Sequence, residues 1–179
     1  MEFQTLVESR RSIRSYKPDT TIDKNVLEEI IKTAQEAPSW KNSQVARYYV
    51  ISTPEKLAQV KANCLPEFNQ KNCADAPALI VTTFEKNRSG FERDGSATNE
   101  IGNEWGAYDL GLANAYLLLK AKEFGLDSLV MGIRNESALR SELDIPESQE
   151  VVSVISLGYA NGESQRPPRK ELDHVAKFF

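Results

Sequence analysis

Histidine is almost missing from this chain of 179 residues, which contains one, His174, close to the C-terminus. A single histidine argues against a multi-histidine metal site and against a histidine-based catalytic triad. His174 is expected to be a surface residue, and no metal site is expected. The nucleophile elbow G-x-S-x-G, the P-loop, the G-x-G-x-x-G fingerprint and the H-E-x-x-H motif are also missing. Any chemistry is therefore expected to need no proton shuttle from the protein, which hints at a redox cofactor, because such a cofactor brings its own reactive atoms and leaves binding and orientation to the protein.

Cysteine and long apolar runs are scarce too. Cys64 and Cys73 are the only cysteines and have no C-x-x-C spacing, so we expect free thiols and a cytoplasmic location. No apolar run approaches the length of a membrane span, and the charged segment MEFQTLVESRR is not expected to be a secretory signal. The net charge of −4 leaves no basic surplus. Neither a membrane nor a nucleic acid is expected as a partner.

What the sequence does contain is an alternation of helical and strand patterns. Its length suits a single domain, 1–179, with a sizeable core. Apolar residues recur at helical spacing in 23–37, and a continuous apolar run at 78–84 predicts a buried strand. The expected helices are 2–10, 23–37, 53–62, 104–124 and 136–143, and the expected strands are 47–52, 78–84, 127–131 and 151–159. We therefore expect an α+β protein, with helices flanking a central sheet.

Two segments depart from ordinary patterning. Residues 85–104 are polar and without periodicity, and so long a stretch within a domain is either disordered or a functional lid. The helix expected at 104–124 is apolar nearly all round and carries small residues such as Gly106, Gly111 and Ala113. Such a helix is typical of a central core or of a dimer interface.

Positive charge is concentrated at two places. Arg10, Arg11 and Arg14 surround Ser12, and guanidinium groups match the geometry of phosphate. The segment 165–170 also concentrates positive charge, with Arg166, Arg169 and Lys170. Its two prolines are expected to hold these side chains on an extended chain. Two interpretations stay open. Both ends of the chain close on one phosphate, or the two clusters are solvated surface cations.

A third polar segment, APSWKNSQ, occupies residues 37–44. Pro38 and Ser39 turn the chain, while Asn42 and Gln44 carry amides with both donors and acceptors. These amides suit the edge of a uracil-like ring, which alternates carbonyl and N–H groups. On spacing alone, a polar turn with side-chain capping is the better explanation.

Taken in order, these segments resemble the FMN-dependent nitroreductase family. RRSIRSY (10–16) is similar to the opening motif of that family, and APSWKNSQ to its A-P-S-x-x-N-x-Q segment. FNQKNCADAP (68–77) resembles the Asn-containing stretch before a buried strand, and 125–132 and 158–175 are similar to the later motifs. The resemblance extends over nearly the whole chain. It implies a central mixed β-sheet flanked by helices, in an intertwined homodimer with two FMN sites at the subunit interface.

The resemblance also implies a role for each motif residue. Arg10, Arg11, Ser12 and Arg14 would contact the phosphate, the ribityl chain and the N1/O2 edge of a tightly bound FMN, and Arg169 with Lys170 would complete the phosphate site. The remaining cofactor-binding residues would be Pro38, Ser39 and Asn42 of the partner subunit, Gln44, Asn69 at the pyrimidine end, and Met131 and Gly132. The backbone of Met131 and Gly132 would lie near N5 and O4, so that these two residues and Arg14 would serve catalysis.

The implied activity is the transfer of hydride from NAD(P)H, through flavin N5, to a nitroaromatic, quinone or similar acceptor in a ping-pong cycle. Phe91 and Trp105 are candidates to line the acceptor pocket. Two alternatives stay open, a non-catalytic flavin-binding or flavin-sequestering protein and a phosphate- or nucleotide-binding regulatory module. Val45 and Ala46 stand where the family usually has proline and an aromatic residue, and the chain is short for the family. These departures concern the choice of acceptor.

Overall fold

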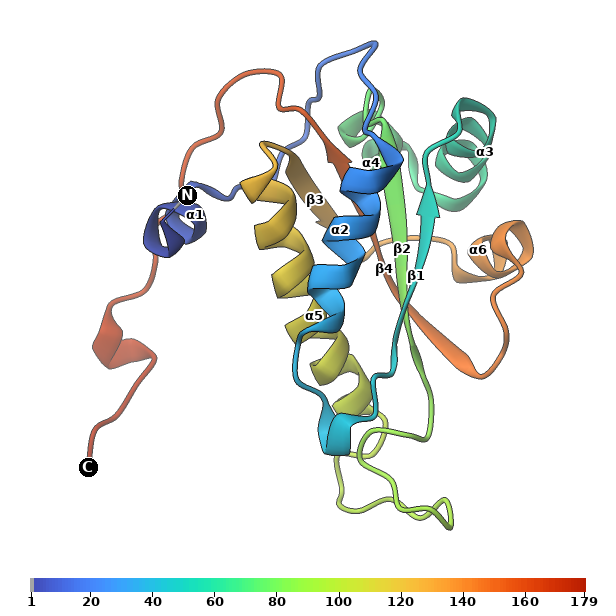
Figure 1. Ribbon diagram of the computed structural model, residues 1–179, viewed down its shortest axis with the longest axis vertical. Helices are drawn as coiled ribbons and strands as arrows, with labels where there is room; N and C mark the ends of the chain where they lie inside the picture. The colour runs from blue at the N-terminus through green and yellow to red at the C-terminus, as the bar shows by residue number, and fades with distance from the viewer. Residues whose placement is uncertain (1) are drawn as a thin grey trace.

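A four-stranded sheet organises the computed structural model, which describes residues 2–179 (Figure 1). The strands are β1 (Ala46–Ile51), β2 (Ala78–Glu85), β3 (Asp127–Met131) and β4 (Gln149–Gly158), in the order β1-β2-β4-β3. All three strand pairs are antiparallel. The parallel contact expected of a mixed sheet is limited to an isolated bridge between Ser12 and Ser128. The expected α+β class is confirmed.

The two central strands are buried almost throughout, which explains the continuous apolar run of β2. Their buried hydroxyl groups are paired within the sheet. The Thr82 and Ser153 hydroxyls lie 2.8 Å apart, and Thr83 Oγ1 donates to Gln149 Oε1 at 2.6 Å. Because a buried polar group costs free energy unless it is hydrogen-bonded, these pairs allow polar residues within the core.

Helices cover both faces of the sheet (Figure 1). On one face α2 (Lys24–Gln35) and α5 (Glu104–Glu123) pack together, and Leu27, Ile30 and Leu117 meet Ile80 and Ile155 of the sheet. The other face is covered by α3 (Pro54–Cys64), α4 (Glu67–Asn72) and α6 (Glu136–Leu143). The result is a three-layer arrangement in which each sheet face has its own apolar cluster.

Cys64 and Cys73 belong to the core beneath α3 and α6. Both are free and fully buried, and burial raises the pKa of each thiol to about 11. Because the thiolate is the reactive form, these groups are inert packing residues at neutral pH.

The structure differs from the sequence patterns at two places. Helix α4 was not predicted, because its six residues carry no apolar stripe and Asn69 is their one buried side chain. The polar segment before α5 has a defined path. Its base is joined by two hydrogen bonds between Asn87 and Asn103, at 2.6 and 2.8 Å, and Trp105 Nε1 donates to Asn99 at 3.0 Å.

The terminal segments contribute little to the core. Helix α1 (Phe3–Ser9) buries one residue, Leu6, and the short 3-10 helix η2 (Leu172–His174) buries none. Residues 161–175 are exposed throughout and run away from the sheet (Figure 1). Large apolar side chains are exposed along this tail, among them Leu172, Val175, Phe178 and Phe179. Across residues 2–179, none of the helices combines the length and apolarity that a bilayer crossing requires.

Candidate functional site

The arginine-rich segment is fixed along the edge strand β3. Ile13 N donates to Ser128 O at 2.9 Å, and the Ile13 side chain is buried. Tyr16 is buried three residues later, and its hydroxyl lies 2.8 Å from Ser156 Oγ. Burial raises the pKa of Tyr16 well above its ordinary value, so its phenol is a neutral anchor. With Ile13 and Tyr16 facing inward, Ser12 and Arg14 are exposed to solvent.

A shallow cavity of about 250 Å³ opens beside this segment. Ser12 and Arg14 line it together with residues 161–164, which begin the C-terminal tail. Asn161 N donates to Ser15 O at 3.0 Å, and Lys17 N donates to Tyr159 O at 2.8 Å. The arginine segment and the start of the C-terminal tail therefore meet at this point. Arg169 and Lys170 lie further along the exposed tail, where Arg169 Nη1 donates to Pro167 O.

The far end of β3 presents open backbone. Gly132 is exposed, and a Cβ built on it would meet nothing within 4 Å. The Met131 side chain is buried in the core, so only its backbone is available to a ligand. Asn69 is buried beside this segment, with Nδ2 donating to Ile133 O at 2.9 Å. That bond fixes the backbone that follows Gly132, and Asn69 Oδ1 accepts from Asn72 Nδ2 at 3.4 Å.

The segment 38–44 forms a tight loop with strained backbone. It contains the one-turn helix η1 (Trp40–Asn42), and Lys41, Asn42 and Gln44 have φ values of 45°, 53° and 48°. Residues with a Cβ disfavour this left-handed region by about 1–2 kcal/mol each. Ser39 helps to hold the turn, because its hydroxyl accepts from Gln44 N at 3.0 Å.

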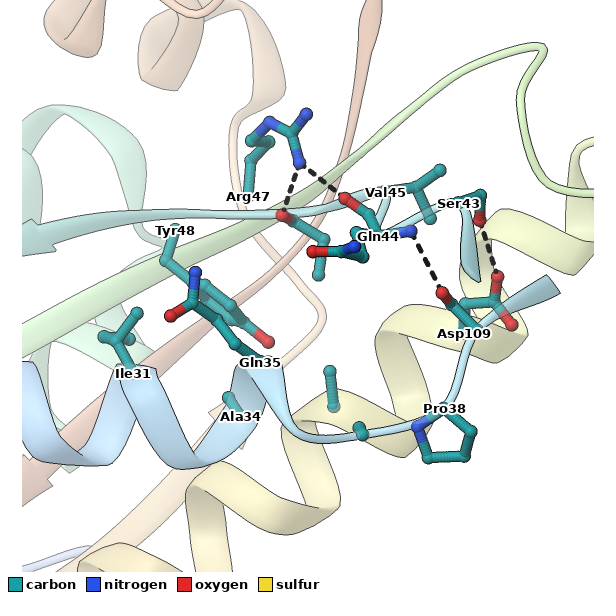
Figure 2. Close-up of a pocket in the computed structure, with 14 residues that line it drawn as sticks. Ile31, Ala34, Gln35, Pro38, Ser43, Gln44, Val45, Arg47, Tyr48 and Asp109 are labelled. Atoms are coloured by element: carbon teal, nitrogen blue, oxygen red, sulfur yellow. Dashed lines mark hydrogen bonds between the residues drawn. The ribbon is translucent and has the colours of Figure 1, made fainter. Parts of the chain in front are cut away.

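A larger cavity, of about 490 Å³, lies between this loop, α2, β1 and α5 (Figure 2). Pro38, Ser39 and Gln44 are among its lining residues, whereas Asn42 is not. Tyr48 also lines the cavity, and its buried hydroxyl has no hydrogen-bond partner within the described chain. Burial raises the pKa of this tyrosine.

The expected site residues therefore form two groups at opposite edges of the sheet. The arginine segment and Gly132 accompany β3, whereas the loop 38–44 leads into β1. Strands lie about 4.8 Å apart, so the two edges of a four-stranded sheet are separated by about 14 Å. One chain does not bring the two groups together.

Asp109 also belongs to the region around the loop 38–44, although no sequence motif indicates it. It is buried in α5, and its carboxylate accepts from Trp40 N at 2.9 Å. In the sequence, Asp109 stands out only as an acidic residue in a helix that is otherwise apolar. That pattern by itself indicates only that the helix does not cross a membrane.

Comparison with known proteins identifies the group to which the chain belongs. The model of the nitroreductase family matches residues 7–72 and 58–159. An Archaeoglobus fulgidus protein, provisionally named NADH dehydrogenase/NAD(P)H nitroreductase, is 33% identical over 88% of this chain and 85% of its own length. A Bacillus subtilis protein, YdgI, provisionally named NAD(P)H nitroreductase, is 26% identical over 99% of this chain and 97% of its own.

A solved structure shows the same fold. It is a nitroreductase from Exiguobacterium sibiricum, provisionally named and described in complex with FMN, with a TM-score of 0.84 and 22% identity. The alignment covers 99% of this chain and 97% of that one. Together with the match of the family model over most of the sequence, these findings settle the relationship. The chain belongs to the nitroreductase family.

Proposed function

We propose that this protein is an FMN-dependent oxidoreductase that takes electrons from NAD(P)H and passes them to a nitroaromatic, quinone or similar acceptor. The observation that carries the proposal is the arginine segment, which is held on β3 by Ile13 and on β4 by Tyr16 while Ser12 and Arg14 face solvent. That arrangement presents cationic and hydroxyl groups to solvent along the strand whose far end carries the open backbone of Gly132. Because the chain belongs to the nitroreductase family, we expect the anion bound there to be the phosphate of FMN.

The residues present fit FMN. A phosphate group requires cationic and hydroxyl donors, which Arg10, Arg11 and Ser12 supply. A flat ring requires open backbone, and Gly132 has no neighbour where a Cβ would project. FMN, when bound, supplies the two-electron redox chemistry that the side chains of this chain lack.

Within this proposal, each group of residues has one task. Arg10, Arg11 and Ser12 bind the phosphate and the ribityl chain, and Arg169 with Lys170 complete the phosphate site. Arg14 places positive charge at the N1/O2 edge. The backbone of Met131 and Gly132 would lie against the ring, and Asn69 holds this backbone through Nδ2. Asn69 Oδ1, which accepts from Asn72 Nδ2 at 3.4 Å, is the atom proposed for the pyrimidine end.

The separation of the two groups supports a homodimer. Because the loop 38–44 and the arginine segment lie at opposite sheet edges, Pro38, Ser39, Asn42 and Gln44 would reach a flavin held by the partner subunit. The exposed apolar tail supports this arrangement, since side chains such as Phe178 and Phe179 have no cover in their own chain. Tyr108 and Tyr116 of α5 are exposed as well.

The activity is tested by steady-state oxidation of NADH and NADPH, with a nitroaromatic and a quinone supplied separately as acceptors. Turnover that depends on added acceptor supports the proposal. A protein that retains FMN without turnover would be a non-catalytic flavin-binding protein. A protein that binds no FMN would indicate that the arginine segment binds another phosphate compound.

Arg14→Ala is expected to lower the two-electron potential of the bound FMN. A guanidinium beside N1/O2 favours the gain of electrons, so its removal makes reduction harder. The expected change is about 30 mV for each ~1.4 kcal/mol of stabilisation lost. Arg14→Lys should recover part of the change, because it restores the charge without the planar fork. The measurement is the midpoint potential of each variant. An unchanged potential with weaker FMN binding would show that Arg14 is only an anchor.

A further inference from the structure

Asp109 connects three parts of the chain through one carboxylate oxygen. Its Oδ2 accepts from Trp40 N at 2.9 Å and from Ser89 Oγ at 2.6 Å. Ser43 approaches the same oxygen at 3.5 Å, as Figure 2 shows, and its hydroxyl lies 2.6 Å from that of Ser89. The helix α5 thereby holds both the loop 38–44 and the start of the polar segment that follows β2.

These contacts act on backbone that would otherwise relax. Lys41, Asn42 and Gln44 all lie in the left-handed region, where each residue with a Cβ is disfavoured. Such conformations persist only where the surroundings impose them. The bond from Trp40 N fixes the residue directly before this strained run, so the carboxylate determines where the run begins.

A second connection reinforces the first. Lys41 Nζ lies 2.9 Å from Glu92 Oε1, and Thr98 Oγ1 donates to that oxygen at 3.2 Å. This ion pair is exposed, and an exposed pair contributes about 1 kcal/mol or less. Asp109 is buried, and a charge-assisted bond in a buried site contributes more. The buried carboxylate is therefore the main determinant of the loop's position.

We propose that Asp109 is a positioning residue for the flavin site. It acts through the backbone of Trp40 to hold the loop 38–44 in the shape that meets the cofactor of the partner subunit. This inference rests on the proposed function, because it takes Ser39 and Asn42 to be flavin contacts. The role proposed for Asp109 is exerted through Trp40 and requires no contact between Asp109 and the cofactor.

The two tryptophans of the chain give a direct readout of loop position. Trp40 in the loop and Trp105 at the start of α5 have ring centroids 4.8 Å apart, with planes inclined at 49°. Two tryptophan rings this close are expected to contribute a joint signal to the circular dichroism spectrum, and this signal should be lost when Trp40 moves away from Trp105. The signal is measured on the protein without FMN, so it tests the position of the loop whether or not flavin binds.

The experiment compares Asp109→Leu, which keeps the bulk and removes the acceptor, with Asp109→Asn, which keeps one carbonyl oxygen. Asp109→Leu should lose the tryptophan signal and weaken FMN binding roughly tenfold or more, the effect of a lost charge-assisted bond. Asp109→Asn should retain most of both. Glu142→Gln is the matched control, because Glu142 accepts from Asn63 and Lys56 and lies away from the loop.

Two results would overturn the proposal. One is an Asp109→Leu protein with an unchanged tryptophan signal, and the other is a loss of FMN affinity no larger than that of Glu142→Gln. If Asp109→Leu does not fold, Ser89→Ala removes a donor to the same oxygen and should cause both changes at a smaller size, so their absence there counts against Asp109. A wild type that has the signal but binds no FMN would refute the proposed function alone.

Discussion

Removal of residues 162–179 is expected to convert the protein into monomers and to weaken FMN binding roughly a hundredfold or more. Two causes combine. The deletion removes Arg169 and Lys170, and the loss of one charge-assisted contact to phosphate corresponds to about tenfold in affinity. It also removes the apolar side chains from Leu172 to Phe179, which are exposed in the single chain and are expected to bind the partner.

The sheet and both apolar clusters should survive this deletion, because residues 162–175 are exposed and belong to neither cluster. Sedimentation velocity gives the oligomeric state, and fluorescence titration gives the FMN affinity. The control is the full-length Arg169→Ala/Lys170→Ala double variant, which should lose affinity and remain a dimer. A truncated protein that is still dimeric and binds FMN as tightly as the wild type would contradict the role given to the tail.

Gly106→Ala is expected to reduce the free energy of unfolding by about 1–3 kcal/mol, the usual range for overpacking, or by more. A Cβ at this position would lie 2.5 Å from Cε2 of Phe84, closer still to Cδ2 and 3.1 Å from Cγ of that ring. Phe84 belongs to β2, and its ring is buried in a cluster with Leu110 of α5, so the ring has little room to move. The substitution should therefore push α5 away from the sheet and displace Asp109 with it.

Gly111→Ala is the matched control, because it changes the same helix at a position with no neighbour within 4 Å of the added Cβ. It should leave the stability unchanged or raise it by up to about 1 kcal/mol, since alanine is the better helix former. Urea unfolding of both variants at one protein concentration gives the comparison. Equal stability of the Gly106→Ala protein and the wild type would show that α5 is not held in the described contact.

Much of the fold could be predicted from local sequence patterns. The apolar run of β2 and the helical spacing of Val26, Leu27, Ile30 and Ile31 both indicate the correct element, because burial selects residues with the period of the local structure. Helix α4 could not be predicted in this way. It is short, and its buried residue is Asn69, whose amide is satisfied by the distant carbonyl of Ile133.

The site was predicted residue by residue only through the family resemblance. Spacing alone leaves Arg10 and Arg11 as possible surface cations and Asn42 as a turn residue. Two features needed the fold. One is the placement of the arginine segment and the loop 38–44 at opposite sheet edges, and the other is the carboxylate of Asp109, which reaches Trp40 across 69 positions of sequence. Both depend on long-range packing, which no local pattern encodes.

The central claim is that each flavin is held by the arginine segment of one subunit and the loop 38–44 of the other. Heterodimers formed from an Arg10→Ala chain and an Asn42→Gly chain test it directly, since glycine tolerates the left-handed backbone of residue 42 while the side chain with its amide is removed. Each homodimer should bind FMN weakly. If the site is shared, every heterodimer contains one intact site and one doubly altered site, so the purified heterodimer should bind one FMN tightly. Heterodimers that bind FMN as weakly as the two homodimers would contradict the shared site.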